Sequence, residues 1–171
     1  GNRGSIVYLR SDKDAPNRKV IAVDLRSPAP EGWTTIVPEQ KDALEGVAVI
    51  GGRVVAQYLV DVQSRLRLFG LDGSDQGEIA LPGTGTVAGL AGREDAPDVW
   101  YMFSSPLTPT TVYRYDPATK LSVAFEAAPP PVDASQYETI AGFATSKDGT
   151  RVPYFLTAKK NLPRDGNNPT M

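Results

Sequence analysis

The feature that most constrains this chain is a strand pattern that recurs at a fixed interval. The segments VIAVDL (20–25), LRLFGL (66–71) and VYRYDP (112–117) align so that Asp24, Gly70 and Asp116 follow one another at intervals of 46 residues. One more strand pattern comes after each segment, in the order WTTIVP (33–38), GEIALP (77–82) and LSVAFE (121–126). A regular spacing of this length is typical of folds that repeat one supersecondary unit.

Further strands complete the repeated unit on its N-terminal side. VAVIG (47–51) and RVVAQYLVD (53–61) precede the second segment, while TVAGLAG (86–92) and DVWYMFS (98–104) precede the third. β-Branched and aromatic residues dominate these runs, and Gly or Pro residues separate them, as in successive hairpins. We therefore expect two complete four-stranded antiparallel units, at about 44–82 and 86–126, preceded by three strands of another at 6–37.

A four-stranded unit of about 40 to 50 residues has the size of one β-propeller blade. We predict an all-β fold, namely an incomplete β-propeller of about two and a half four-stranded antiparallel blades within residues 1–128. Such a run does not close a ring, so we expect the chain to be a piece of a larger protein. We also expect this piece to self-associate through its exposed blade faces. The alternative architecture is a sandwich of about a dozen strands, which needs no further partner.

One segment departs from the strand pattern. PEQKDALEGV (38–47) carries Pro38 and Glu39 at its start and Gly46 near its end, an arrangement that suggests a short helix. Helices of this length are marginal without tertiary support, so we favour a connecting turn, with the short helix as the alternative.

Composition argues against several classes of function. The 171 residues include 18 Lys and Arg against 20 Asp and Glu, and this net charge of −2 offers no basic surface to nucleic acid. No apolar run approaches the ~20 residues that cross a bilayer, so we expect no membrane partner.

The chain has no His and no Cys, which removes the proton carrier of a Ser-His-Asp or Cys-His site. Since Ser-x-x-Lys and Gly-x-Ser-x-Gly are also missing, we predict no catalytic, cofactor-binding or metal-binding residue in this chain.

Several turns resemble ligand-binding loops. GTGT (83–86) lacks the Gly-Lys-Ser/Thr that follows in a phosphate loop, and we interpret it as a tight turn between blades. DGSD (72–75) and DGNN (165–168) lack the later bidentate Glu of a calcium loop, so we assign them to turn chemistry as well. Asp24 and Asp116 are expected to fix the turns after their strands through hydrogen bonds from side chain to backbone.

Four residues of the predicted strands have a side-chain chemistry that suits binding. We assign Trp33 and Trp100 to the blade core, in preference to stacking on a ligand. Arg65 and Arg67 alternate along one strand and so share a face. We favour a solvated sheet face for them, with a central pore as the alternative.

The C-terminal part breaks the repeat. Three successive prolines at 129–131 form a stiff connector that cannot continue a central strand. YETIAGFATS (137–146) and RVPYFLTAKK (151–160) then flank a Lys-Asp-Gly turn, in which Gly149 can adopt the positive φ of a tight hairpin. We predict a domain boundary here, with residues 129–171 forming a linker and the first hairpin of a second, truncated domain.

Taken in order, five segments cover most of the chain: YLRSDKDAPNRKVIAVDL, WTTIVPEQKDALEGV, YLVDVQSRLRLFGLDG, SSPLTPTTVYRYD and DASQYETIAGFATSKDGTRVPYFLTAKKNLPRDGNNPT. The most specific motifs are the YRYD strand end (113–116) and the SKDGT hairpin (146–150). In this order the chain resembles the prolyl oligopeptidase family, from the last blades of its propeller into the start of its peptidase domain.

The resemblance implies a serine peptidase that cleaves short peptides after proline, with a seven-bladed propeller covering the active site. It further implies that residues 129–171 begin an α/β-hydrolase domain and that the catalytic Ser, Asp and His lie beyond Met171. This chain alone is therefore expected to be inactive, and proline-containing peptides are partners of the intact enzyme only. We expect a cytoplasmic protein, with the periplasm or secretion as alternatives. The alternative function is a free-standing β-repeat module that binds a protein or ligand.

Overall fold

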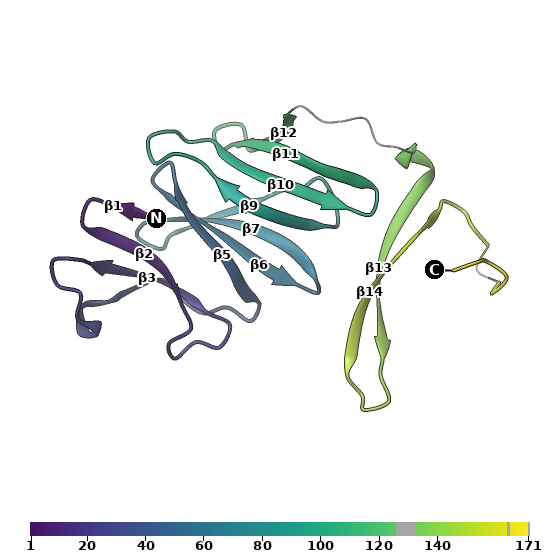
Figure 1. Ribbon diagram of the computed structural model, residues 1–171, viewed down its shortest axis with the longest axis horizontal. Coiled ribbons are helices and arrows are strands. Elements are labelled where there is room, and N and C mark those ends of the chain that lie inside the picture. The colour runs from purple at the N-terminus through teal and green to yellow at the C-terminus, as the bar shows by residue number, and fades with distance from the viewer. Residues whose placement is uncertain (126–132, 164, 171) are drawn as a thin grey trace.

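The computed structural model describes residues 1–125, 133–163 and 165–170. Figure 1 shows three twisted sheets stacked face to face, with a long hairpin standing apart from them. Each stacked sheet has four antiparallel strands, and the strand order in each sheet is the order in the chain. In the part of the chain that the structure describes, no helix is long and apolar enough to cross a membrane.

The first sheet contains β1 (Asn2–Arg3), β2 (Ile6–Ser11), β3 (Lys19–Asp24) and β4 (Thr34–Val37). The second contains β5 (Ala43–Ile50), β6 (Arg53–Val60), β7 (Gln63–Gly70) and β8 (Asp75–Ile79). The third contains β9 (Thr86–Ala91), β10 (Val99–Ser105), β11 (Thr108–Asp116) and β12 (Leu121–Phe125). The hairpin pairs β13 (Tyr137–Thr145) with β14 (Arg151–Lys159), and two 3₁₀ turns, η1 (Pro30–Gly32) and η2 (Ala134–Gln136), complete the elements.

The repeated four-stranded unit is confirmed, and the sandwich alternative is wrong, because the three units are separate sheets that follow one another in a stack. The first unit differs from the expectation of three strands. Its fourth strand is β1, where Asn2 and Arg3 pair with Val7 and Ile6 of β2. This two-residue strand is polar, so it lacks the apolar alternation that marks the others.

The short helix, which was the alternative at 38–47, does not form. Residues 38–42 connect β4 to β5, as the favoured connecting turn predicts, and β5 begins at Ala43. Leu44 is fully buried and Gly46 pairs with Gln57 of β6. Burial and pairing in a sheet therefore override the local helix signal, as tertiary contacts commonly do for short segments.

Apolar side chains on both faces of the second sheet hold the stack together. Val54 and Val55 are adjacent in β6 and both have no exposed surface, although a strand points them to opposite sides. One face packs on the first sheet in a cluster of Tyr8, Val20, Val37, Leu44, Val54, Ala56, Tyr58 and Phe69. The other packs on the third sheet in a cluster of Ile50, Val55, Leu66, Leu68, Ile79, Val87, Val99, Tyr101, Phe103 and Tyr115. Burial of apolar surface contributes about 25 cal/mol for each Å² removed from water, so this sheet is stable only when both of its apolar faces are covered.

A polar link joins the second and third sheets inside the apolar interface. Ser64 is buried, and its hydroxyl accepts a hydrogen bond from the Val87 N–H at 2.9 Å. The Ser64 N–H donates to the Gly85 carbonyl at 3.1 Å, and the Gln57 side-chain amide donates to the Val87 carbonyl at 2.9 Å. These bonds satisfy the backbone of β9 where it meets the second sheet, so they fix how the two sheets align.

The C-terminal hairpin forms as expected. Its nine cross-strand pairs run from Tyr137 opposite Lys159 to Thr145 opposite Arg151, and Gly149 takes a φ of 84° in the turn. The three prolines at 129–131 lie outside the described residues, as do 126–128 and 132. Among the described residues, β13 and β14 form a two-stranded sheet that no third strand joins.

Gly51 and Gly52 allow a test of the stack, because both have a positive φ and differ only in their surroundings. A Cβ on Gly51 would lie 2.8 Å from the Pro97 Cα and 2.9 Å from the Ala96 carbonyl oxygen, whereas a Cβ on Gly52 meets nothing within 4 Å. We expect Gly52→Ala to cost about 1 kcal/mol of unfolding free energy for backbone strain, and Gly51→Ala about 2–4 kcal/mol. Urea unfolding measures both, and equal losses would show that the Gly51 turn does not contact the third sheet.

Candidate functional site

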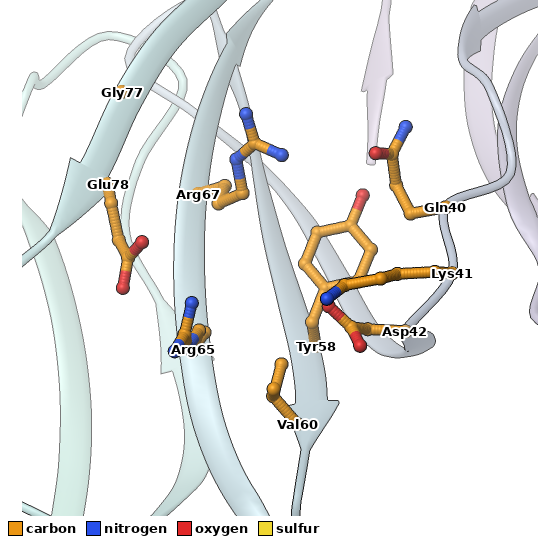
Figure 2. A pocket seen from close by; sticks show the side chains of 9 residues that line it. All are labelled: Gln40, Lys41, Asp42, Tyr58, Val60, Arg65, Arg67, Gly77 and Glu78. Atoms are coloured by element: carbon orange, nitrogen blue, oxygen red, sulfur yellow. The ribbon is translucent and has the colours of Figure 1, made fainter.

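A cavity lies on the face of the second sheet that is turned toward the first (Figure 2). Its volume is about 530 Å³, within the range of about 300–1,000 Å³ that small-molecule pockets occupy. Residues from the β4–β5 connection and from β6, β7 and β8 line it: Gln40, Lys41, Asp42, Tyr58, Val60, Arg65, Arg67, Gly77 and Glu78.

Strand register brings the charged residues of the second sheet to this one face. Tyr58 of β6 lies opposite Arg65 of β7, and Arg67 lies opposite Glu78 of β8. Arg65 and Arg67 are two residues apart, so both point to the side on which Tyr58 lies. The two-residue turn at Asp61 and Val62, both with positive φ, fixes the β6–β7 part of this register.

Tyr58 is the most buried polar residue of the cavity, with 3% of its surface exposed. Its hydroxyl has no hydrogen-bond partner among the described residues. In Figure 2 this hydroxyl points between Arg67 and Gln40. Burial raises the pKa of the Tyr58 phenol, and the Arg67 cation offsets part of that rise. The phenol is thus neutral at ordinary pH, and its oxygen is buried, so the ring and not the hydroxyl forms the wall of the cavity.

Arg67 is held in place by neighbours outside the cavity. Its guanidinium is ion-paired and hydrogen-bonded with Asp75, and it also lies 5.2 Å from the centre of the Phe69 ring. The Gly77 N–H, followed by the Arg67 cation, holds the pKa of Asp75 below its ordinary value. A guanidinium has five N–H donors, so Arg67 keeps donors for a ligand after this pairing.

Four other charged side chains line the cavity without an ion pair in the part of the chain that the structure describes. They are Lys41, Asp42, Arg65 and Glu78. The cavity therefore presents two free positive and two free negative groups beside a buried hydroxyl. This arrangement suits binding by hydrogen bonds and charge. In the described ranges, no group of three or more acidic side chains forms a metal site.

Arg65 and Arg67 are both cavity residues, though their surroundings differ. Arg65 is exposed, as a solvated sheet face predicts, whereas the side chain of Arg67 retains only 33% of its exposure. Sequence reasoning missed Tyr58, Lys41, Asp42 and Glu78. The alternation of β6 and β7 contained a signal for Tyr58, because a two-residue turn places it opposite Arg65.

The prediction that both tryptophans belong to the blade core is wrong. Trp33 precedes β4 and is half-buried, and its indole N–H donates to the Pro28 carbonyl at 2.9 Å. Trp100 lies in β10 on the face turned away from the second sheet, where its ring meets Phe125 edge to face at 5.3 Å between ring centres. Neither is part of the two core clusters.

The turn assignments are confirmed. Asp24 accepts from the Arg26 N–H at 3.0 Å and Asp116 from the Ala118 N–H at 2.8 Å. Asp72 and Asp165 accept the N–H two residues later in the same way, each at 3.0 Å. GTGT (83–86) connects the second sheet to the third, with Thr86 beginning β9. The carboxylates of these loops are thus engaged by their own turns.

Comparison with known proteins gives consistent matches over nearly the whole chain. The family profile described as "Prolyl oligopeptidase, N-terminal beta-propeller domain" matches residues 1–127. The prolyl endopeptidase of Elizabethkingia meningoseptica is 32% identical over 168 residues, which are 98% of this chain and 24% of that protein.

Solved structures agree with the sequence matches. A structure from a study of two prolyl endopeptidases superposes with a TM-score of 0.87 at 36% identity, covering 98% of this chain and 25% of that one. Prolyl oligopeptidase B from Galerina marginata, solved with a 35-residue hydrolysis and macrocyclization substrate, has a TM-score of 0.79 at 29% identity over 93% of this chain and 23% of its own. The chain thus spans about a quarter of the length of the relatives that it matches.

The buried tyrosines predict how stability depends on alkaline pH. Burial raises the pKa of Tyr58, Tyr101 and Tyr115 in the folded chain above the unfolded value of about 10. The unfolded chain therefore loses these protons first, so the contribution of the tyrosines to the unfolding free energy should be fully present below pH ~10 and fall as pH rises further. Tyr58→Phe should make this fall shallower in urea unfolding at a series of pH values. An equally steep fall in the variant would contradict the assignment.

Proposed function

Because the chain belongs to the prolyl oligopeptidase family, whose N-terminal β-propeller domain its residues 1–127 match, we propose that it is the propeller part of a proline-specific serine peptidase. The observation that carries this proposal is the stack of three four-stranded sheets, which superposes on about a quarter of a prolyl endopeptidase at a TM-score of 0.87. The chain itself has no His and no Cys, so we assign the cleavage chemistry to another part of the longer protein.

We propose that these sheets cover the active site and admit short peptides. The peptidase domain then cleaves these peptides after proline. Covering an active site excludes water from the reaction, and the opening that the cover leaves limits the size of the substrate that enters. Support comes from the two continuous apolar interfaces, which join the three sheets into one wall. The similar protein from Galerina marginata has been solved with a peptide substrate, which supports a peptide as the ligand class.

We also propose a division of the chain into residues 1–128, which belong to the propeller, and residues 129–171, which form a linker and the first strands of the peptidase domain. The match of the family profile to residues 1–127 and the self-contained pairing of β13 with β14 support this division. For the intact protein we propose the cytoplasm, in preference to the periplasm or secretion, on the strength of the family resemblance alone, and cell fractionation tests it.

Hydrolysis of a chromogenic Gly-Pro peptide tests the function. We expect no turnover by the purified 171-residue chain and cleavage after proline by the longer protein that contains it, because only the latter supplies a nucleophile with its base. The longer protein should also spare the same Gly-Pro sequence when it lies inside a folded domain.

Three outcomes would contradict the proposal. Turnover by the chain alone that survives repurification would place catalysis in these sheets. A coding sequence that ends after residue 171 would favour a free-standing binding module. A longer protein that does not cleave after proline would exclude the proposed activity.

The outward face of the third sheet predicts self-association of the chain. Leu121, Val123 and Phe125 of β12 are 62%, 60% and 50% exposed, and they extend the apolar surface of Trp100 and Met102. Apolar surface of this extent is uncommon on a monomer, so we propose that copies of the chain associate through it. Sedimentation should show a concentration-dependent mass that Val123→Lys lowers and the exposed-turn variant Ser27→Lys does not. A compact wild-type monomer at high concentration would contradict this.

A further inference from the structure

The hairpin of β13 and β14 has two outer edges, and its register shows which backbone groups face them. The Lys160 N–H donates to the Gln136 carbonyl at 2.8 Å, and the Ser146 N–H donates to the Thr150 carbonyl at 2.9 Å. These bonds lie at the two ends of a ladder that is in continuous register. Hydrogen-bonded and non-hydrogen-bonded pairs alternate along an antiparallel ladder, so the even-numbered residues bond each other across the hairpin. The odd-numbered residues of both strands therefore direct their N–H and C=O groups outward.

The outer edge of β14 carries features that oppose pairing with a further strand. Pro153 is odd-numbered, so the N–H that it lacks would have faced outward. Arg151 and Lys159 are exposed at the two ends of the strand. If two copies of β14 paired antiparallel about Phe155, Arg151 of each copy would lie opposite Lys159 of the other, and like charges in this position are destabilising. Proline and exposed charge are common protection for an edge strand.

The outer edge of β13 has neither of these protective features. Its sequence, YETIAGFAT (137–145), contains no Pro, Lys or Arg, and its register with β14 shows no bulge. Figure 1 shows the hairpin standing apart from the stacked sheets, and among the described residues no third strand joins it. The outward backbone groups of Thr139, Ala141 and Phe143 can therefore pair with an added strand.

A second copy of β13 fits this edge by symmetry. In an antiparallel pair centred on Ala141, each outward residue of one copy meets an outward residue of the other, and a two-fold axis relates the copies. Glu138 is the one charged residue of β13, and this register places it opposite Ala144 of the second copy. No like charges face each other across this pair, in contrast to a pair of β14 strands.

The apolar face of the hairpin also favours pairing. Ile140, Val152, Tyr154 and Leu156 lie on one face, and the last three are 44%, 48% and 37% exposed. An isolated two-stranded hairpin is marginally stable in water, and three or more strands with an apolar face are needed for independent stability. Two hairpins joined through β13 form a four-stranded sheet, and their apolar faces are continuous because the two-fold axis is perpendicular to that sheet.

We infer that the outer edge of β13 is a strand-addition site, and that its occupant is β13 of a second copy of this chain, paired antiparallel about Ala141. The contact is made by backbone groups of the hairpin. It goes beyond the function proposed above and is separate from the association through the third sheet.

Disulfide trapping tests the inference in a Val123→Lys background, which keeps the third-sheet contact out of the measurement. The chain has no Cys, so Ala141→Cys introduces a single thiol. The two Cα atoms of a hydrogen-bonded antiparallel pair are about 5.5 Å apart, a separation that a disulfide spans. Mild oxidation should therefore give a covalent dimer about tenfold or more faster than for the control Val152→Cys, an exposed position on β14.

Charge variants in the same background give a reversible measurement. Ala141→Lys and Ala141→Glu each place like charges opposite each other at the two-fold axis, so sedimentation should show a dimer Kd about fivefold or more above that of the parent. A mixture of the two variants places opposite charges there and should restore the parent Kd. The matched control Val152→Lys adds the same charge away from the axis and should leave the Kd unchanged.

The inference fails on any of three results. A Val123→Lys chain that is folded by circular dichroism and stays monomeric at high concentration would exclude a second copy, and a strand from elsewhere in the longer protein would then be the occupant of this edge. Equal trapping of Ala141→Cys and Val152→Cys would indicate association through the apolar face. A mixture of the charge variants that associates no better than either variant alone would place the contact away from Ala141.

Discussion

The structure depends on one constraint, which is that the middle sheet is apolar on both of its faces. Val54 and Val55 are neighbours in sequence and have no exposed surface, yet they point in opposite directions. A sheet of this kind cannot stand alone in water, and it is covered by the first sheet on one side and the third on the other. The cavity exists where this cover is incomplete, because Arg65 and Arg67 take the places of apolar residues on the same face.

Most of the strands could be predicted from the sequence, because the patterns that indicate them can be read along the chain without knowing how the sheets pack. Strand alternation and the 46-residue interval between Asp24, Gly70 and Asp116 are local signals that need no knowledge of packing. The segment at 38–47 was different, since its helix signal was weaker than the burial of Leu44 between two sheets. The short β1 was missed for the opposite reason, because only its pairing with β2 makes it a strand.

The cavity was only partly predictable. Arg65 and Arg67 were evident as alternating charges, but their partner Tyr58 depends on the register of a turn at Asp61 and Val62. A β-branched residue such as Val62 is rare at positive φ, so the sequence of that turn does not indicate a tight hairpin. The β4–β5 connection that adds Lys41 and Asp42 reaches the site only through tertiary packing.

The order of strands within each sheet has a consequence for how the chain assembles. Every stacked sheet is built from one contiguous segment, and consecutive strands are always neighbours. Loop closure inside a sheet is therefore short-range, while the longer-range step is the docking of one finished sheet on the next. Each sheet can therefore form from its own segment, and the exposed face of a finished sheet offers a surface on which its neighbour docks, so folding can start in any sheet and spread along the stack.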